Sequence, residues 1–396
     1  MDRRTKFPIP KPPELQCKFV PATVGLPNEE NTGWLNIIVQ CLCNAEPFVK
    51  YFLANGHQTD LRKKYGINME KEGRVVNGLA QLFQNMWNPS TPGTLRDMKN
   101  KFKKIIGQVY PQWKGDDLQD AFEFLVILLD TLSEELDLRA TKPTQYRHAL
   151  VWKAVWLHYK IFIPLVHMTL FSKDKSEQQL EAEMIAGYLN RFKTIVQDNF
   201  IGFIRTSVTC SRCNKDTLTF DPSMTLWLPF PMPNENSGDA VTLADCFDCY
   251  TAPEKISGSY FCVHCQKEFG VVKQTKLWLT PQIWVICLNR FGTRGVPTLG
   301  KRVDYPIEGL DLSPWVKSPR NEGNIYDLFG VVTYSSFDGS LNRGYYAAYC
   351  KNPVDHAWRK FSDERVEIVN LDVAYSKEKI QEEAYVLFYT RRGHAN

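Results

Sequence analysis

The sequence predicts an α+β fold, in which a helical half precedes a half built mainly of antiparallel strands. Between about residues 34 and 136, apolar residues recur every three or four positions, as on the buried face of a helix. After about residue 203 the pattern changes to short alternating or β-rich runs, broken by Gly, Pro, Asn and Asp. The helices that would connect parallel strands are missing between these runs, so we expect an antiparallel sheet.

The helical half contains three strongly periodic segments, namely WLNIIVQCL from Trp34, VVNGLAQLFQNMW from Val75 and LQDAFEFLVILLDTLSEEL from Leu118. Residues 137–200 continue as helix-prone sequence, and their charged run SKDKSEQQLEAE indicates a solvated face or an insertion. The Pro-rich residues 1–21 predict a flexible, extended leader. A tether is the favoured role for this leader, and a P-x-x-P ligand from Pro10 to Pro13 is the alternative.

The second half contains six runs with the composition of strands. They are TLTFDPSMTLWLPFP, KQTKLWLT, IWVICLNRF, YDLFGVVTY, GYYAAYCKN and EAYVLFYTRR. Short runs of this kind, bounded by turn residues, predict that the second half is mostly sheet.

Composition excludes several classes of protein. The chain of 396 residues is 43% hydrophobic and 13% aromatic, which is enough apolar surface for a large folded core. Its 48 Lys and Arg against 44 Asp and Glu are interspersed, so we expect no nucleic-acid partner. The N-terminus lacks an apolar signal segment, and the longest apolar stretch, residues 151–171, is interrupted by charges and a proline. We therefore expect no membrane span and a reducing intracellular compartment.

Six of the eleven cysteines form three C-x-x-C pairs, which are Cys210/Cys213, Cys246/Cys249 and Cys262/Cys265. In a chain without a secretory signal, such pairs favour metal binding over disulfides. Two pairs supply the four thiolates of a tetrahedral structural Zn²⁺ site. Spacing alone leaves two combinations open, since the last pair can join either of the other two.

Several segments together resemble the ubiquitin-specific protease family. GLPNEENTGWLNIIVQCL (25–42) resembles the family box GLxNxGNTCYxNxxLQxL, and LQDAFEFLVILLDTL (118–132) resembles the helix QQDAxEFLxxLLDxL. RGYYAAYCKNPVDHAWRKFSDERV (343–366) resembles the strands GHYxAYxKNxxxxxWxxFDDxxV, and AYVLFYTRR (384–392) resembles the closing strand. The segments CLCNAEPF, DYPIEGLDLS and YCKN are similar to the subfamily of the endosomal member. The resemblance covers roughly residues 22–392.

The resemblance implies a papain-like cysteine protease fold with a helical thumb, an antiparallel-sheet palm and zinc-ribbon fingers. It places the thumb at about residues 22–200, including a helix-rich insertion at about 140–195, the fingers at about 203–275 and the palm at about 276–392. In this family the fingers hold one structural Zn²⁺ through the pairs that match Cys210/Cys213 and Cys262/Cys265, and we expect that pairing here.

The catalytic positions of the family are all changed in this sequence. In the family, a cysteine thiolate attacks the C-terminal glycine carbonyl of ubiquitin, a histidine takes the thiol proton, and an Asp or Asn orients the imidazole. The matching residues here are Gly33, Tyr345 and Ser362. A glycine has no attacking atom, and a phenol with a reference pKa of about 10 is a poor base. Asn28 matches the residue whose amide helps stabilise the oxyanion, and we interpret it as a relic.

No neighbouring residue is expected to restore the chemistry. Cys41 lies eight residues along the same expected helix, about 12 Å from Gly33 at about 1.5 Å per residue. Thr32 has a hydroxyl but no histidine to activate it, because His356 falls in the variable turn before Trp358.

The resemblance also implies a groove for the basic C-terminal tail of ubiquitin. Asp120 and Glu123 match acidic family positions on the helix that lines this groove, where opposite charges favour capture. Two features are expected to narrow the groove, namely Trp34 and the longer turn from Gly339 to Gly344.

These observations predict a catalytically inactive ubiquitin-specific protease homologue that acts by protein interaction and holds ubiquitin or a ubiquitinated protein without cleaving it. The alternative is an active thiol-dependent deubiquitinase that removes ubiquitin from conjugates. A third hypothesis is a scaffold that has lost ubiquitin too and binds through the insertion at 140–195. We expect a cytoplasmic location, with the nucleus as the alternative.

Overall fold

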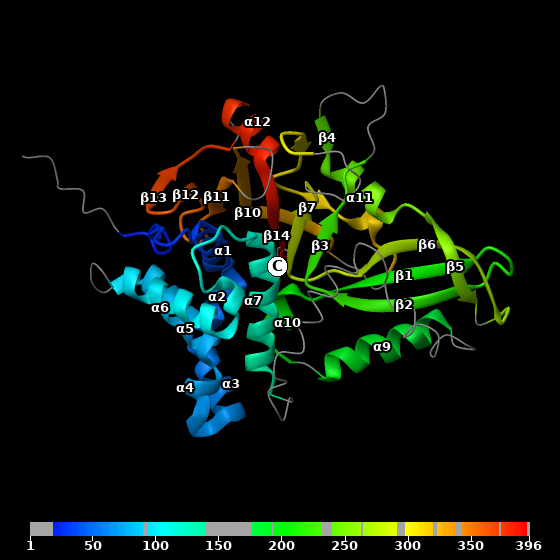
Figure 1. Cartoon of the computed structure of the whole chain (residues 1–396), viewed down its shortest axis with the longest axis horizontal. Helices are drawn as coiled ribbons and strands as arrows, with labels where there is room; N and C mark the ends of the chain where they lie inside the picture. Colours follow the sequence, from blue (N-terminus) through cyan, green and yellow to red (C-terminus); the bar gives the residue numbers. More distant parts are fainter. Residues whose placement is uncertain are drawn as a thin grey trace, which may run out of the picture.

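A computed structural model describes the chain at residues 19–89, 94–138, 176–191, 193–231, 240–262, 264–290, 298–319, 323–337, 343–371 and 374–393. Helices dominate the first half and strands the second (Figure 1). The predicted α+β class is therefore confirmed. Residues 1–18 of the expected leader (1–21) and most of the expected insertion (about 140–195) lie outside the described residues.

The helices of the first half are α1 (Gly33–Cys43), α2 (Glu46–Leu53), α3 (Gly56–Tyr65), α4 (Met69–Glu72), α5 (Arg74–Trp87), α6 (Thr94–Val109), α7 (Ala121–Leu136), α9 (Glu177–Arg191) and α10 (Ile195–Phe200). Helix α1 is the centre of this layer, because every residue from Trp34 to Cys43 is buried. It contacts α2 and α7 on the helical side and β11 (Gly344–Lys351) of the large sheet. A helix that is apolar all round is expected to be enclosed in this way.

The large sheet has the strand order β13-β12-β11-β10-β14-β7-β3, with β9 paired to β10. Its other strands are β3 (Thr225–Leu228), β7 (Ile283–Leu288), β9 (Leu310–Asp311), β10 (Ile325–Ser336), β12 (Trp358–Ser362), β13 (Arg365–Ile368) and β14 (Ala384–Arg391). All neighbours are antiparallel except β3 and β7, which run parallel. The expected antiparallel sheet is therefore confirmed except at this edge.

Alternation along the central strands gives the sheet two buried faces. Val332 and Ala348 belong to the core shared with α1, whereas Val331 and Ala347 belong to a second core. The second core also includes α11 (Leu243–Thr251) and the surroundings of α12 (Ala374–Glu383). Neither helix was predicted from the sequence, whose pattern indicated mainly strands in this half.

A separate four-stranded sheet has the order β2-β1-β6-β5 and extends away from the helices (Figure 1). Its strands are β1 (Gly202–Cys210), β2 (Asp216–Ser223), β5 (Glu254–Cys262) and β6 (Lys267–Leu279). Helix α9 covers one face, where Leu180 packs with Phe203 and Phe220. On the opposite face, Thr206 pairs with Thr219 and with a threonine of β6. Val208, two residues along the strand from Thr206, packs with Tyr260 and Val271 in a small buried cluster, so this opposite face is polar only in part.

Two short strands, β4 (Ala240–Thr242) and β8 (Arg302–Asp304), pair in parallel beside α11 and α12. Among the described helices, none combines the length and the apolar character needed to cross a bilayer.

Candidate functional site

The N-terminus of α1 is the place where the sequence motif expects a nucleophile. Gly33 is the first residue of the helix, and the loop before it contains two non-glycine residues in the left-handed region, Glu30 at φ 61° and Asn31 at φ 55°. Such backbone conformations are costly unless the surroundings fix them. Here the Asn28 carboxamide fixes the loop, since its Oδ1 accepts a hydrogen bond of 2.7 Å from the Thr32 N–H.

Asp363 is brought to this helix end from the turn between β12 and β13. Its carboxylate accepts hydrogen bonds from Asn28 Nδ2 at 3.0 Å and from Asn36 Nδ2 at 3.1 Å. A Cβ on Gly33 would lie 3.8 Å from both Asn28 Nδ2 and Asp363 Oδ1. Sequence reasoning missed Asp363, although its place directly after Ser362 in the strand motif was the available signal.

Helix α6 connects the loop before Gly33 to the turn between β12 and β13. Arg96 forms ion pairs with Glu29 at 3.0 Å and with Glu364 at 3.1 Å. Asn100 Nδ2 donates to the Glu29 carboxylate at 2.6 Å, which lowers the pKa of Glu29. Lys99 is buried below and donates to the Glu29 carbonyl at 3.4 Å, and its burial lowers the pKa of its ammonium. The loop before Gly33 is therefore held by polar and charged side chains of α6.

Tyr345 and Ser362 lie on neighbouring strands of the large sheet. Tyr345, in β11, is 43% exposed, and its ring lies 5.8 Å from that of Phe337, which is 75% exposed. Ser362 ends β12. His356 lies in the turn at the opposite end of β11, so most of that strand, about 20 Å at 3.3 Å per residue, separates it from Tyr345. The expectation that His356 has no catalytic placement is consistent with this geometry.

The thiols on α1 lie in the core. Cys41 and Cys43 are fully buried, and Cys41 Sγ lies 3.8 Å from Cys350 Sγ of β11. Burial raises the pKa of the Cys43 thiol and of the Cys350 thiol far above the usual range. The thiols of Cys43 and Cys350 therefore stay protonated at neutral pH, and protonated thiols are poor nucleophiles.

Asp120 and Glu123 occupy the first turn of α7 but differ in role. The Asp120 carboxylate caps the helix, because it accepts from Phe122 N at 2.7 Å and Glu123 N at 3.2 Å. The Tyr385 hydroxyl also donates to it at 2.8 Å. Burial raises the pKa of Asp120, and its oxygens are engaged by these hydrogen bonds within the protein. Glu123 is exposed on the same turn.

Trp34 does not have the position that the sequence suggested. Its side chain is fully buried in the helical layer, where its ring lies 4.9 Å from Phe124 and 5.9 Å from Trp113. The expectation that Trp34 narrows a groove is therefore corrected, since the indole fills the core beneath the helix. The turn from Gly339 to Gly344, the second feature expected to narrow it, lies largely outside the described residues.

Four cysteines meet at the far end of the four-stranded sheet. The sulfur atoms of Cys210, Cys213, Cys262 and Cys265 all lie within 4.8 Å of one another. Cys213 Sγ and Cys262 Sγ are 3.7 Å apart, which matches the edge of about 3.8 Å expected for a tetrahedron with metal–sulfur bonds of about 2.3 Å. Backbone N–H groups of Cys213 and Arg212 lower the pKa of the Cys210 thiol to about 7. This set of thiols can therefore hold one metal ion.

The third C-x-x-C pair is excluded from this site. Cys246 and Cys249 lie on α11, where Cys246 is fully buried in the second core and its pKa is raised to about 12 by burial. Within the described chain they join no group of potential metal ligands. Of the two combinations left open by spacing, the structure therefore brings together the pairs at 210/213 and 262/265.

Comparison with known proteins is consistent with this architecture. The chain is 28% identical over 379 residues to ubiquitin carboxyl-terminal hydrolase 2 of Rattus norvegicus, which covers 95% of this chain and 55% of the relative. It is 30% identical over 320 residues to the Gallus gallus protein of that name, covering 80% and 79%. The chain thus spans little more than half the length of the rat relative.

Solved structures show the same fold. The SAGA DUB module bound to monoubiquitin has a TM-score of 0.65 at 19% identity, covering 94% of this chain and 70% of that chain. The module bound to ubiquitin aldehyde has a TM-score of 0.63 at 19% identity, with the same shares. The papain-like architecture of ubiquitin-specific proteases, expected from the sequence, is therefore confirmed. A family model described as "Ubiquitin carboxyl-terminal hydrolase" matches residues 24–389. The chain belongs to the ubiquitin carboxyl-terminal hydrolase family.

Proposed function

We propose that this protein is a catalytically inactive member of the family that binds ubiquitin and does not cleave ubiquitin conjugates. The observation that carries the proposal is Gly33 at the start of α1, with an amide and a carboxylate beside it and the thiols of α1 buried in the core. Acyl transfer through a covalent intermediate needs a nucleophile within reach of an activating base. Tyr345, at the position of the base, has no imidazole. Ser362, at the orienting position, therefore has no imidazole to orient.

The alternative is an active thiol-dependent deubiquitinase. It is favoured by the match of the family model over residues 24–389 and by the names of the relatives. A conserved fold does not fix chemistry, because activity depends on the residues of the site. Hydrolysis of a fluorogenic ubiquitin conjugate separates the two hypotheses, and we expect no turnover above a control without protein.

Ubiquitin binding is supported by the charge at the first turn of α7, and the face of the four-stranded sheet opposite α9 is a second candidate surface. Glu123 presents a carboxylate at the first turn of α7, while Asp120 holds that turn through its capping bonds. On the sheet face opposite α9, Thr206 and Thr275 are half-buried and their neighbour Thr219 is buried. We propose that Glu123 attracts the basic tail of ubiquitin and that the sheet face opposite α9 contacts its folded body.

A calorimetric titration with ubiquitin tests this part of the proposal. Glu123→Lys should weaken binding by about fivefold and reduce its dependence on salt, since an exposed ion pair contributes up to about 1 kcal/mol. Glu70→Lys on α4 makes the same charge change on an exposed side chain of another helix and should leave the affinity unchanged. If ubiquitin at high concentration produces no binding heat and no competition, the protein is instead a scaffold that has lost ubiquitin binding.

We further propose that the metal held by the four cysteines is one structural Zn²⁺, because a closed set of four thiolates is a preferred zinc environment. The proposed division is thumb at about 22–200, fingers at about 203–275 and palm at about 276–392. Assignment to the subfamily of the endosomal member and a reducing, cytoplasmic location are parts of the same proposal.

A further inference from the structure

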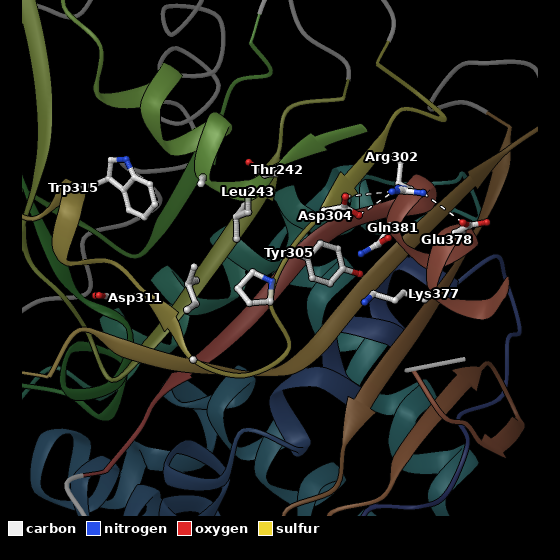
Figure 2. Close-up of a pocket in the computed structure, with 14 residues that line it drawn as sticks. Thr242, Leu243, Arg302, Asp304, Tyr305, Asp311, Trp315, Lys377, Glu378 and Gln381 are labelled. Carbon is white, nitrogen blue, oxygen red and sulfur yellow. Dashed lines mark hydrogen bonds and ion pairs between the residues drawn. The ribbon is translucent and has the colours of Figure 1, made fainter. Parts of the chain in front are cut away.

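A pocket of about 650 Å³ lies on the side of the large sheet that carries the second core (Figure 2). Its lining comes from the start of α11, from β8 and the residues that follow it, from β9 and from α12. This volume is within the range of about 300–1,000 Å³ that is usual for ligand sites. None of the residues of the α1 site or of the cysteine cluster lines it.

Three hydrogen-bond donors meet at one end of this pocket. Lys377 and Gln381 are one helical turn apart on α12, and Tyr305 directly follows β8. Figure 2 shows the polar ends of these three side chains pointing toward one another. Gln381 and Tyr305 are only 4% and 8% exposed, yet within the described chain the Gln381 amide and the Tyr305 hydroxyl have no hydrogen-bond partner. Neither group is among the fully buried polar atoms that lack a partner, and both line the pocket, where a ligand can reach them.

The charges around the pocket distinguish Lys377 from the rest of the lining. Arg302 is held by Asp304 at 3.3 Å and by Glu378 at 3.4 Å (Figure 2). Asp311 accepts a hydrogen bond of 2.9 Å from the Ser313 N–H. Lys377 is exposed at the mouth and forms no ion pair with any residue that the structure describes. Burial raises the pKa of Tyr305, so its hydroxyl remains a donor at neutral pH.

The other end of the pocket is mainly apolar, with Asp311 on the same side as Trp315 (Figure 2). Leu243 and Leu310 are buried, and Trp315 stacks on Phe247 with ring centroids 4.8 Å apart. The Trp315 indole donates to Asp248 at 2.7 Å, which fixes the ring. Donors at one end and a fixed apolar wall at the other suit a ligand that carries an anionic group next to an apolar one.

We propose that this pocket binds the C-terminal end of a partner polypeptide, with the terminal carboxylate at Lys377, Gln381 and Tyr305 and an apolar last side chain against the wall formed by Leu243, Leu310 and Trp315. The C-terminal residue of a polypeptide carries its carboxylate and its side chain on the same α-carbon. Only the segment that precedes this residue needs room to enter the pocket. Charge-assisted hydrogen bonds to a carboxylate are the strong ones in such a site. The proposal is independent of ubiquitin binding.

Fluorescence polarisation with labelled peptides tests the proposal on the full chain. The probes are Gly- and Ser-containing peptides that end in Leu, Phe or Trp with a free carboxylate, the same peptides as C-terminal amides, and an amidated peptide with an internal Glu. We expect the free acids to bind and both amidated sets to bind at least about tenfold more weakly, as the loss of a charge-assisted hydrogen bond implies. Equal binding of acid and amide, or binding of the internal Glu peptide as tight as the free acids, would overturn the assignment.

Variants locate the binding within the fold. Lys377→Glu should weaken the free-acid peptides by about tenfold or more, and Tyr305→Phe, which keeps the ring, should weaken them several-fold. Lys379→Glu is the matched control, because Lys379 is an exposed lysine on the same helix that does not line the pocket. No binding of any free-acid peptide at millimolar concentration, or an equal effect of Lys377→Glu and Lys379→Glu, would contradict the proposal. Thermal melts of the variants confirm that each is folded.

Discussion

Asn28 and Asp363, which are 335 positions apart in the sequence, form a hydrogen bond of 3.0 Å directly beside Gly33. The bond joins the loop before α1 to the turn between β12 and β13, so the two segments that meet at this helix end remain together without a nucleophile. The Asn28 amide already has a carboxylate partner. The hydrogen bonds of Asp363 to Asn28 and Asn36 therefore connect the turn to the loop and to α1.

Gly33→Ala should stabilise the protein by about 0.5 kcal/mol. Gly33 has no positive φ, and a Cβ there would make ordinary contacts at 3.8 Å, so the change mainly lowers the entropy of the unfolded chain. Gly25→Ala is the contrasting variant, because its Cβ would collide with the backbone carbonyl of Glu364. It should destabilise by about 1–3 kcal/mol. Urea unfolding of both variants checks the pair, and a loss of stability at Gly33 would show that the space beside it is not free.

Replacement of one metal ligand should release the bound ion. Cys210→Ser removes one of the four thiols that lie within 4.8 Å of one another, and metal analysis should then show less than one zinc per chain. Cys249→Ser changes a cysteine of α11, outside that cluster, and should keep a full equivalent. Absence of zinc from correctly folded native protein would refute the zinc proposal. Zinc kept by the first variant and lost from the second would refute the choice of cysteine pairs.

Glu135 should make stability fall with rising pH between about pH 4.5 and 7. Its carboxylate accepts hydrogen bonds from the Val75 and Val76 N–H groups at the start of α5, but burial raises its pKa to about 7. The folded state thus binds more protons than the unfolded state, in which the pKa is about 4.3, and stability is lost as pH rises through the folded pKa. Glu135→Gln removes this proton, so the difference in Tm between the native chain and the variant should change across the window and level off above pH 8. A difference that stays constant from pH 4.5 to 8 would contradict the assignment.

Trp34→Ala should unfold the helical layer without opening a channel. The indole is fully buried against Trp113 and Phe124, and removal of a buried aromatic ring costs about 3–5 kcal/mol. Phe337→Ala, at a ring that is 75% exposed, should stay within about 0.5 kcal/mol of the native chain. Chemical denaturation measures both. A stable Trp34→Ala variant with tighter ubiquitin binding would restore the view that Trp34 obstructs a groove.

The sequence predicted the long elements well because their patterns are strong. The apolar periods around Trp34, Val75 and Leu118 became α1, α5 and α7, although α7 begins only at Ala121 because Asp120 caps it. Helix α11 was missed, since its nine residues are too short for a clear period and its C-x-x-C pair suggested a metal site.

The site was predictable only where a motif fixes the position. Gly33, Tyr345 and Ser362 follow from their places in the motifs, and the cysteine pairs follow from the resemblance. Asp363 follows Ser362 directly in the strand motif, but its contacts with Asn28 and Asn36 join segments far apart in the chain, and the motif alone does not show them. The pocket at Lys377 and Tyr305 is likewise made by tertiary packing alone.

The central claim is that no group in this chain can attack a ubiquitin carbonyl, and covalent capture tests it most directly. The native chain is incubated with ubiquitin that carries a thiol-reactive electrophile at its C-terminus, and intact-mass spectrometry then measures the adduct. The triple variant Gly33→Cys, Tyr345→His and Ser362→Asp is the comparison, because it restores thiol, base and orienting carboxylate at the motif positions. The account predicts no adduct on the native chain. An adduct on any cysteine of the native chain that disappears when the ubiquitin is denatured would contradict it.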